Sequence, residues 1–394
     1  MIPPTPLALD EATFVSYVLP PMVCYITTAI LVLRPQTRSF RIALWPLTAM
    51  LSLRAAVSVD MSMDKPALEF LNIDLLAMFC ITERALEWTF PIEPLKRHGR
   101  PKGSAPSVIM DALDLAGNFR GVGWDWSKGL YVPLESRPCF SRTTFALFTL
   151  FSAVLHAFIC GVFHAAVMAF APETLGTSSG GTIFDTTLPP TTRYLRSSII
   201  SIFTAFGIYC VLQMGYDICT IVGVMIFRQD PDQWPPSFES PWFATSVRDF
   251  WGRRWHQWFR RTFVFLGGHP LSFLFGRVGG IFGAFFTSAV FHYTLLVMQN
   301  GQIELSSMLL AFGMMATGVV AEGVFTRVTG RIVGGWAGWM WTMSWLVLWG
   351  NVMVDGWARA GMIGSSGNFL EVIPEVRKFV EQWVMAFDTC LHTC

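Results

Sequence analysis

Apolar stretches long enough to cross a lipid bilayer recur along this 394-residue chain and constrain its fold more than any other feature. The clearest runs from Thr143 to Phe170, and others are Thr13–Leu33, Ser197–Phe227, Gly279–Met298 and Leu305–Phe325. A bilayer core of about 30 Å requires about 20 apolar residues in an α-helix, which satisfies its backbone hydrogen bonds internally. The pattern therefore predicts an all-α polytopic membrane protein.

The composition agrees with this class and excludes others. Hydrophobic residues make up 53% of the chain and charged residues 14%, whereas a soluble domain carries roughly 25% charged residues. A net charge of +1 provides no bulk attraction to nucleic acid. The 16 tryptophans are typical of membrane–water interfaces and of pockets for apolar ligands. We expect a multi-pass protein whose partners include the lipid bilayer and exclude nucleic acid.

Three further apolar segments, Ile42–Val57, Ala67–Phe90 and Trp336–Val354, bring the predicted number of transmembrane helices to about eight. Ala67–Phe90 carries five ionisable residues, which are costly deep in a bilayer, so it should be buried in the bundle or lie partly outside the membrane. Thr262–Gly276, interrupted by glycines and a proline, is too short to cross and is predicted to be re-entrant or interfacial. Basic residues follow the odd-numbered spans, which places those segments in the cytoplasm and both termini in the lumen.

One polar segment, Ser246–Phe263, combines three tryptophans, five arginines and a histidine, and we call it the Trp–Arg motif. On a helical period, one side of the segment carries Trp251, Trp255, Trp258 and Phe259, and the other side carries Asp249, Arg253, His256 and Arg260. Such a helix is typical of a membrane–water boundary. Its arginines also suit a phosphorylated ligand, because guanidinium binds phosphate bidentately. Contact with anionic lipids requires the same residues, so the pattern leaves both interpretations open.

His292 lies in the middle of the apolar span Gly279–Met298. A lone histidine in an apolar helix is often a core residue that bonds a neighbouring carbonyl, but an ionisable residue inside a bilayer is a functional candidate by default. Neutral imidazole accepts a proton near neutral pH without carrying a permanent charge. Ser288, one turn earlier, is in a position to orient the ring. We therefore predict that His292 is functional, as a proton acceptor.

Two other patterns are less specific. Arg120 and Trp124 flank two glycines, which suggests a tight loop that closes on a ligand or on the membrane surface. His156, Cys160 and His164 recur on one face of a helix, as metal ligands do, but no fourth ligand is near and packing is the favoured interpretation. We predict no metal site.

Together these motifs resemble one enzyme family, the wax synthase branch of the membrane-bound O-acyltransferases. The residues that carry the resemblance are Arg120-Gly121-Val122-Gly123-Trp124, Asp249-Phe250-Trp251-Gly252-Arg253-Arg254-Trp255-His256 and the intramembrane His292. More narrowly, the chain is similar to fungal members that acetylate terpenoid and meroterpenoid alcohols. The resemblance covers the chain from Arg120 onward. It implies an MBOAT-like fold, an acyl-CoA donor, an apolar alcohol acceptor and an endoplasmic reticulum membrane.

The resemblance also implies roles for individual residues. His292 would be the catalytic base, and His256 would occupy the family's second active-site position, where plant wax synthases and sterol acyltransferases have asparagine. His256 would then hydrogen-bond the substrate or the developing oxyanion. Acetyl-CoA, or another acyl-CoA, is expected to contact Arg248, Arg253, Arg254, Trp255, Arg260, Arg261, Arg120 and Trp124.

The predicted organisation is a single integral-membrane acyltransferase domain over residues 1–394. It comprises N-terminal spans and a basic loop in 1–119, a catalytic core in 120–354 and a tail in 355–394. Two alternatives remain open. A long-chain wax, steryl or glyceride ester synthase would share these motifs, because sequence does not reveal tunnel length. A transporter or channel can also carry an intramembrane histidine and arginine-rich loops, although we find no inverted repeat in the sequence.

Overall fold

The computed structural model describes residues 5–62, 72, 74–98, 100, 106–127, 130–300, 305–367 and 369–393, with the side chains of 298–300 excepted. Within these residues the chain is almost entirely helical. The strands in this part of the chain are two residues long, β1 (Leu7–Ala8) and β2 (Val59–Asp60), and they pair in parallel with Leu7 opposite Val59. The predicted all-α fold is confirmed. The first residues of the expected span Ala67–Phe90 lie outside the described residues.

The helices form two groups along the chain. The N-terminal group comprises α1 (Glu11–Thr13), a π-helical turn (Phe14–Val18), α2 (Leu19–Val32), α3 (Arg38–Ser58), α4 (Leu76–Glu87) and α5 (Val108–Gly117). The C-terminal group comprises α6 (Arg142–Phe170), α7 (Pro190–Met225), α8 (Val247–Asp249), a π-helical turn (Phe250–Arg254), α9 (Arg260–Phe263), a second such turn (Val264–Gly268), α10 (His269–Asn300), α11 (Leu305–Thr329), α12 (Gly335–Arg359), α13 (Met362–Ser365) and α14 (Pro374–Thr393). Short 3-10 turns occur at Asp125–Ser127, Pro231–Gln233, Pro241–Phe243 and Phe369–Val372.

Each group has its own apolar core. In the N-terminal group, α2 to α5 pack around small residues such as Ala29 and Ala85, with Trp88 and Trp124 beside them. In the C-terminal group, α6, α7 and α10 to α14 enclose a second cluster that includes Phe312 and Trp357. Because lipid chains are as apolar as these side chains, close packing rather than removal from water holds each group of helices together, and small residues such as Ala29 and Ala85 allow that close approach.

Six stretches among the described residues are long and apolar enough to cross a membrane. They are Glu11–Val32, Arg38–Ser58, Arg142–Phe170, Pro190–Met225, Arg260–Val297 and Leu305–Thr329. The protein is therefore a membrane protein, and the six candidates agree with the expected count of eight within one or two. The expected segments Ala67–Phe90 and Trp336–Val354 are not among the six. The helix α4 has 12 residues, about 18 Å at 1.5 Å per residue, and is too short to cross. Tryptophans, Asn351 and Asp355 make α12 less apolar than a typical span.

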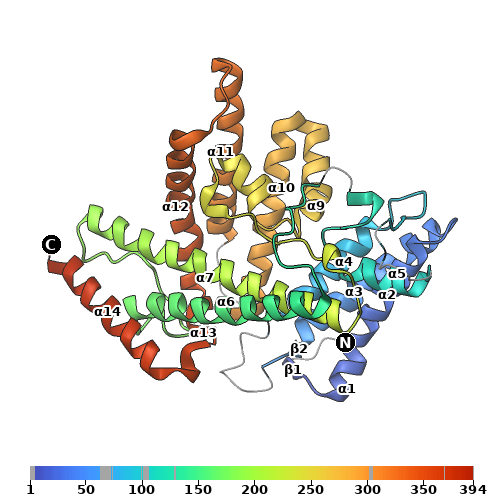
Figure 1. Ribbon diagram of the computed structural model, residues 1–394, viewed down its shortest axis with the longest axis horizontal. Coiled ribbons are helices and arrows are strands. Elements are labelled where there is room, and N and C mark those ends of the chain that lie inside the picture. The colour runs from blue at the N-terminus through green and yellow to red at the C-terminus, as the bar shows by residue number, and fades with distance from the viewer. Residues whose placement is uncertain are drawn as a thin grey trace.

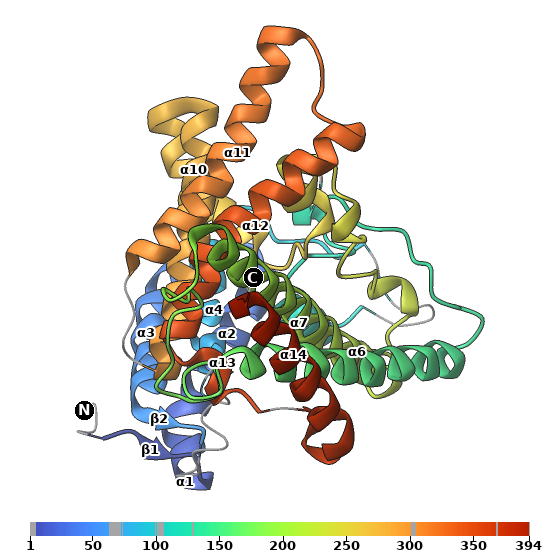
Figure 2. The same ribbon diagram turned by 90° about the vertical axis from the view of Figure 1, so that its left-hand side faces the viewer.

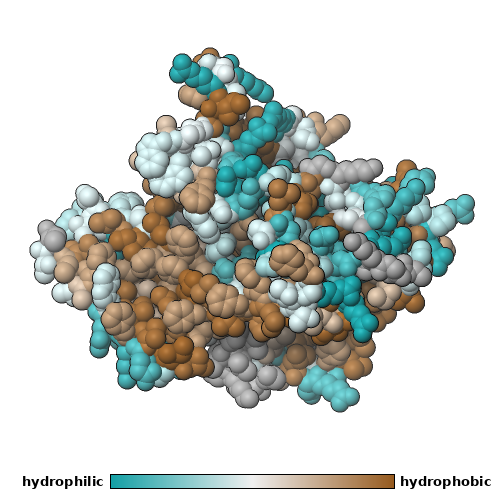
Figure 3. All heavy atoms as spheres, in the orientation of Figure 1, coloured by the Kyte–Doolittle hydropathy of each residue, from teal (hydrophilic) through white to brown (hydrophobic). Residues whose placement is uncertain are grey.

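The long helices cross one another. Figure 1 shows α6 and α7 side by side across the molecule, running in a different direction from α11 and α12. The C-terminal helix α14 packs against α6, and Figure 2 shows it lying over the α6–α7 pair. Apolar residues gather on the face over α6 and α7, whereas polar residues gather toward the top and right of Figure 3. Leu147, Phe151 and Val154 of α6 are exposed apolar residues, which suit contact with lipid chains.

The chain from Arg260 to Asn300 folds back on itself. The helix leaves its regular conformation at Phe275 and Gly276, where Gly276 has a φ of +63° that favours glycine. The two limbs pack very closely, because a Cβ added to Gly267 would lie 2.2 Å from the carbonyl oxygen of Gly283. The first limb thus turns back instead of crossing, as predicted for Thr262–Gly276. The stretch Arg260–Val297 is a helical hairpin rather than one long span.

Candidate active site

The helical hairpin brings the chain around the two predicted catalytic histidines together, because Phe259 contacts both the His256 ring and Phe291, the neighbour of His292. Its limbs are antiparallel, with Gly268 opposite Gly280 and the ring centroids of Phe259 and Phe291 4.7 Å apart. Position 274 is midway in sequence between Gly268 and Gly280, and it is also midway between His256 and His292. The fold-back therefore explains why a motif and a base separated by one apolar hairpin can serve one site.

His256 and His292 line the same cavity, which has a volume of about 1470 Å³. Its walls come from the Trp–Arg motif, the hairpin, α7, α11, α12 and the start of α4. Aromatic rings dominate the lining, with Trp251, Trp255, Trp258, Phe259, Phe263, Phe285, Phe291, Phe312 and Trp357. Such a surface suits a bulky apolar ligand, because a few polar groups among many apolar ones orient a ligand that the apolar walls bind.

The imidazole of His292 is held in one orientation. Its Nδ1–H donates to the carbonyl oxygen of Ser288 at 2.8 Å. A carbonyl only accepts, so this bond leaves Nε2 as the unprotonated nitrogen. Phe312 and Trp357 lie beside the ring, with centroid distances of 4.8 and 6.5 Å. Ser288 orients the histidine as predicted, but through its backbone, so any residue at position 288 supplies this bond.

His256 lies among aromatic rings. Phe238 meets its ring edge-on at 5.7 Å, and Trp258 lies 5.0 Å away between centroids. Its Nδ1 is buried and has no hydrogen-bond partner among the described residues. Burial, and then the nearby charges of His292 and Arg120, lower the pKa of His256 to about 3. The ring is therefore neutral at physiological pH, so it has one N–H to donate.

The Trp–Arg motif is not the single amphipathic helix that its pattern predicted. α8 ends at Asp249 and is followed by a π-helical turn that ends at Arg254. The chain is then extended at Trp255, and α9 begins at Arg260. Competing donors occupy the carbonyls that would continue the helix. The Gln257 amide donates to the carbonyls of Trp251 (3.1 Å) and Trp255 (2.6 Å), and the Glu239 N–H donates to that of Arg254 (3.0 Å). The break brings motif residues of both predicted faces into the cavity.

A buried carboxylate that the sequence analysis missed anchors the motif. Glu322 on α11 is 6% exposed and accepts the backbone N–H groups of Val247 at 2.6 Å and Arg248 at 3.0 Å. It also accepts the indole N–H of Trp341 at 3.0 Å. A carboxylate at the first turn of a helix satisfies N–H groups that have no partner within the helix. Glu322 thus fixes where the motif begins, and a single acidic residue in an apolar span was its only signal in the sequence.

Four of the residues predicted to contact acyl-CoA line the cavity, namely Arg248, Arg253, Trp255 and Arg260. Arg253 is already paired with Asp249 at 3.1 Å and lies over the Tyr131 ring at 5.4 Å. Arg260 donates to the carbonyl of Gly252 at 3.1 Å. The fourth, Trp255, stacks on Phe250 at 5.4 Å. Arg253 is the only one of the three arginines with an ion pair among the described residues, and Arg248 is the one whose guanidinium has neither an ion pair nor a hydrogen bond there.

The other four lie outside the cavity lining, and each is bound elsewhere. Arg254 pairs with Asp249 at 2.6 Å and donates to the carbonyl of Glu239 at 3.0 Å. Arg261 pairs with Glu87 and donates to the carbonyl of Trp126. These two arginines join the motif to neighbouring segments.

Arg120 and Trp124 of the glycine loop are also structural. Trp124 is 3% exposed in the N-terminal core, where its indole N–H donates to Asp114 at 2.8 Å. Arg120 is 7% exposed and bonds backbone carbonyls and a tyrosine. The structure therefore does not bring this loop to the ligand cavity.

Two arginines that were not predicted as ligand contacts do line the cavity. Arg277 follows the hairpin turn, and Arg327 lies near the end of α11. Both are exposed, and neither forms an ion pair with any residue that the structure describes. Figure 1 shows the hairpin turn and this end of α11 on the same side of the molecule. We call Arg248, Arg277 and Arg327 the arginine rim.

The histidines considered as metal ligands have other partners. His156 donates from Nδ1 to the carbonyl of Ser152 at 2.7 Å, and His164 donates from Nε2 to that of Ile363 at 2.7 Å. Cys160 between them is buried. These bonds support the interpretation of this helix face as packing.

A family comparison agrees with the motifs. Residues 234–314 match the model of the membrane bound O-acyl transferase family. This segment contains the Trp–Arg motif, the hairpin and both histidines of the candidate site. The resemblance predicted from these residues is therefore confirmed for the part of the chain that holds the cavity.

Several similar curated proteins are fungal transferases. Acetyltransferase eriL of Hericium erinaceus is 29% identical over 43% of this chain and 47% of its own length. Acetyltransferase ple2 of Rhodocybe pseudopiperita is 26% identical over 67% of this chain and 71% of its own length. O-Mevalon transferase yanI of Aspergillus niger is 27% identical over 42% of this chain and 36% of its own length. The chain thus spans about half the length of the first of these relatives.

Proposed function

We propose that this protein is a membrane-bound O-acyltransferase that transfers acetyl from acetyl-CoA to a hydroxyl group of a terpenoid or meroterpenoid alcohol. The observation that carries the proposal is one aromatic cavity lined by His256, by His292 and by arginines that form no ion pair among the described residues. The family match and the fungal relatives named acetyltransferases support the acyl-transfer chemistry.

The arginine rim suits the phosphates of an acyl-CoA. Guanidinium groups without a carboxylate partner bind phosphate strongly and bidentately. Arg277 and His292 are separated by fifteen residues of one helix, which corresponds to about 22 Å at 1.5 Å per residue. An extended pantetheine arm covers a distance of this order, so phosphates at the rim leave the thioester near the histidines.

The two histidines divide the chemistry between them. An alcohol is a poor nucleophile until it loses its proton, which Nε2 of His292 accepts as the oxygen attacks the thioester carbonyl. The neutral His256 donates its N–H to the oxyanion that develops there. The carbon–sulfur bond then breaks, the ester forms, and the proton on His292 passes to the departing thiolate of CoA. All atoms and charges are accounted for without a metal.

The acceptor is proposed from the cavity walls. Aromatic and aliphatic side chains line the cavity around both histidines, and such a surface binds a fused-ring or isoprenoid alcohol better than a polar one. Such an alcohol partitions into the bilayer and would reach the site from the membrane. We propose the endoplasmic reticulum as that membrane.

Radiolabelled acyl donors test this function directly. Purified protein in lipid nanodiscs would receive labelled acetyl-CoA or palmitoyl-CoA with a panel of terpenoid alcohols, and labelled esters would be separated by chromatography. We expect acetyl esters from wild-type protein and none from His292→Ala. Esters formed from palmitoyl-CoA alone would indicate a long-chain ester synthase. The absence of any ester would contradict acyl transfer and return attention to a transporter.

A further inference from the structure

Arg120 makes contacts that acyl-CoA binding does not explain. Its Nη1 donates to the carbonyl of Pro236 at 2.8 Å, and its Nη2 lies 2.5 Å from both the carbonyl of Pro235 and the phenol oxygen of Tyr216. No carboxylate pairs with it among the residues that the structure describes. A buried guanidinium bound to backbone oxygens holds that backbone in place, because leaving any of these groups unpaired is costly.

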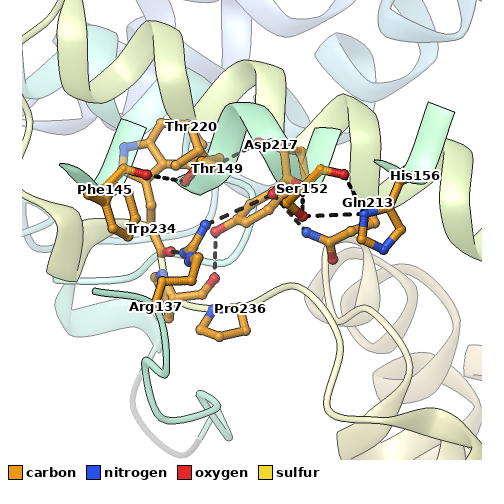
Figure 4. Close-up of polar contacts among 12 residues, drawn as sticks. Arg137, Phe145, Thr149, Ser152, His156, Gln213, Asp217, Thr220, Trp234 and Pro236 are labelled. Atoms are coloured by element: carbon orange, nitrogen blue, oxygen red, sulfur yellow. Dashed lines mark hydrogen bonds and ion pairs between the residues drawn. The ribbon is translucent and has the colours of Figure 1, made fainter. Parts of the chain in front are cut away.

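A second arginine binds the same segment. Arg137 donates to the carbonyl of Trp234 and lies 3.9 Å from the Asp217 carboxylate. Figure 4 shows Arg137 directed at Trp234, with Asp217 bound by Ser152. Three successive carbonyls, at 234–236, are thus bound by two arginines, which we call the arginine clamp. The two prolines in this segment have no N–H groups of their own, so these carbonyl bonds fix its path.

The clamped segment leads directly to His256. Phe238, two residues further on, is 7% exposed and meets the rings of Trp255 at 5.0 Å and His256 at 5.7 Å, both edge-on. Tyr209 of α7 backs Phe238 at 4.7 Å. The Arg120 charge also contributes to the lowered pKa of His256, after burial and His292. Movement of the segment would therefore move the ring that packs on His256.

We propose that Arg120 is a positioning residue for His256, which acts by holding the segment 234–238 and so seating Phe238 against the imidazole. Arg120 then does not contact acyl-CoA. This inference rests on the proposed function, because the position of His256 is read out through acyl transfer. It predicts that loss of Arg120 changes the rate of the chemical step and leaves the binding of both substrates unchanged.

The test compares Arg120→Gln, Arg120→Lys and Phe238→Leu in the nanodisc assay with acetyl-CoA and one alcohol. A misplacement of about 1 Å costs about a hundredfold in rate, so we expect Arg120→Gln to lower kcat by about tenfold to hundredfold. Both KM values should stay within about threefold of wild type. Lysine supplies one donor group in place of a fork, so Arg120→Lys should be intermediate. Phe238→Leu should lower kcat with the arginine intact.

Arg196→Gln is the matched control. Arg196 is also buried, at 4% exposed, and pairs with Asp388 at 2.7 Å while donating to the carbonyl of Phe170 at 2.6 Å. None of its contacts involves the segment before His256. The control variant should lose thermal stability and keep the kcat of wild type, which separates positioning from general loss of folded protein.

The outcomes distinguish the possibilities. A higher KM for acetyl-CoA in Arg120→Gln at unchanged kcat would make Arg120 a ligand contact and overturn the proposal. Unchanged kinetics in both Arg120→Gln and Phe238→Leu would also overturn it. If Arg120→Gln does not fold, Phe238→Leu alone decides, because an unchanged kcat there breaks the proposed link. Failure of the wild-type protein to form any ester would contradict the proposed function instead.

Discussion

The arginine rim and the arginine clamp contain the same residue type in opposite environments. Rim residues such as Arg277 are exposed, line the cavity and have no ion pair among the described residues. Of the clamp residues, Arg120 is buried and Arg137 is half-buried, and their donors are occupied by carbonyls, a phenol or carboxylates. A free guanidinium can bind an incoming phosphate, whereas one whose donors are occupied can only hold the chain. The function of an arginine here follows from its partners rather than from its place in a motif.

The largest expected loss of activity comes from changing the histidines, because neither the arginine rim nor the arginine clamp can replace a catalytic base. His292→Ala removes the base and should lower kcat by about 10²–10⁴-fold, the usual contribution of a positioned acid or base. Thr294→Val, a change at a half-buried residue of the same helix that lies outside the cavity lining, should keep wild-type activity. Near-normal turnover by purified His292→Ala would contradict the proposed mechanism.

The next largest effect is expected at His256. His256→Ala should cost about 2–4 kcal/mol of transition-state stabilisation, as for a lost oxyanion donor. His256→Asn should retain part of the rate, because an amide N–H can replace a ring N–H. Measurement of kcat with one alcohol decides the role. Equal and severe losses in both variants would instead indicate a second base.

The arginine rim should affect the donor and not the acceptor. Arg277→Gln combined with Arg327→Gln removes two charge-assisted contacts of about 1.5–3 kcal/mol each. The apparent KM for acetyl-CoA should rise by at least about tenfold, with little change in the KM for the alcohol. Arg331→Gln, an exposed arginine outside the cavity lining, serves as the control. Equal changes in both KM values would remove the rim from phosphate binding.

Arg254 is an arginine of the Trp–Arg motif whose donors are occupied, so its substitution tests the contrast with the arginine rim. Its guanidinium is bound by Asp249 and by the carbonyls of Glu239 and Ser240. Arg254→Gln should lower the free energy of unfolding by about 1–3 kcal/mol through the lost bonds, with a smaller change in the KM for acetyl-CoA than the rim variants. Thermal melts in detergent and initial-rate kinetics measure the two quantities. A large change in KM with unchanged stability would return Arg254 to the ligand site.

The smallest effect concerns pH. The pKa of His256 is lowered from 6.5 to about 3 in the folded protein. A base whose folded pKa is lowered contributes full stability above pH 6.5 and loses it as the pH falls toward 3, because protons bind the unfolded chain first. His256→Asn should therefore lose less stability than wild type between about pH 7.5 and about pH 5.5. Identical pH dependence of the melting temperatures would argue against a buried neutral His256.

Much of the fold was predictable because membrane insertion is determined by local composition. The apolar runs led to the all-α membrane class, and the glycines and proline of Thr262–Gly276 indicated a segment that turns back. Six candidate spans agree with the expected eight within one or two, and Ala67–Phe90 is not among them because hydrophobic bulk alone did not reveal that the described helix α4 is 12 residues long. The pattern predicted one helix for the Trp–Arg motif, but the Glu239 N–H and the Gln257 amide bind backbone carbonyls that would otherwise continue that helix. These donors reach the motif through folding, so the helical period of the motif does not reveal them.

The sequence by itself determined the membrane class and the family resemblance, and it led to the prediction that His256 and His292 form the candidate site. These conclusions depend on residue types and their spacing along the chain. Only the tertiary structure decided which arginines are free to bind a ligand. Arg120 and Arg277 carry the same charge, and local sequence does not report which carbonyls or carboxylates lie near a guanidinium. Folding brings Pro235 and Tyr216 to Arg120, whereas it leaves Arg277 at the cavity without an ion pair among the described residues. An arginine that is buried and hydrogen-bonded in the folded chain is structural, whereas one that is exposed and has no partner can bind a ligand. Both burial and the available partners are properties of the folded chain.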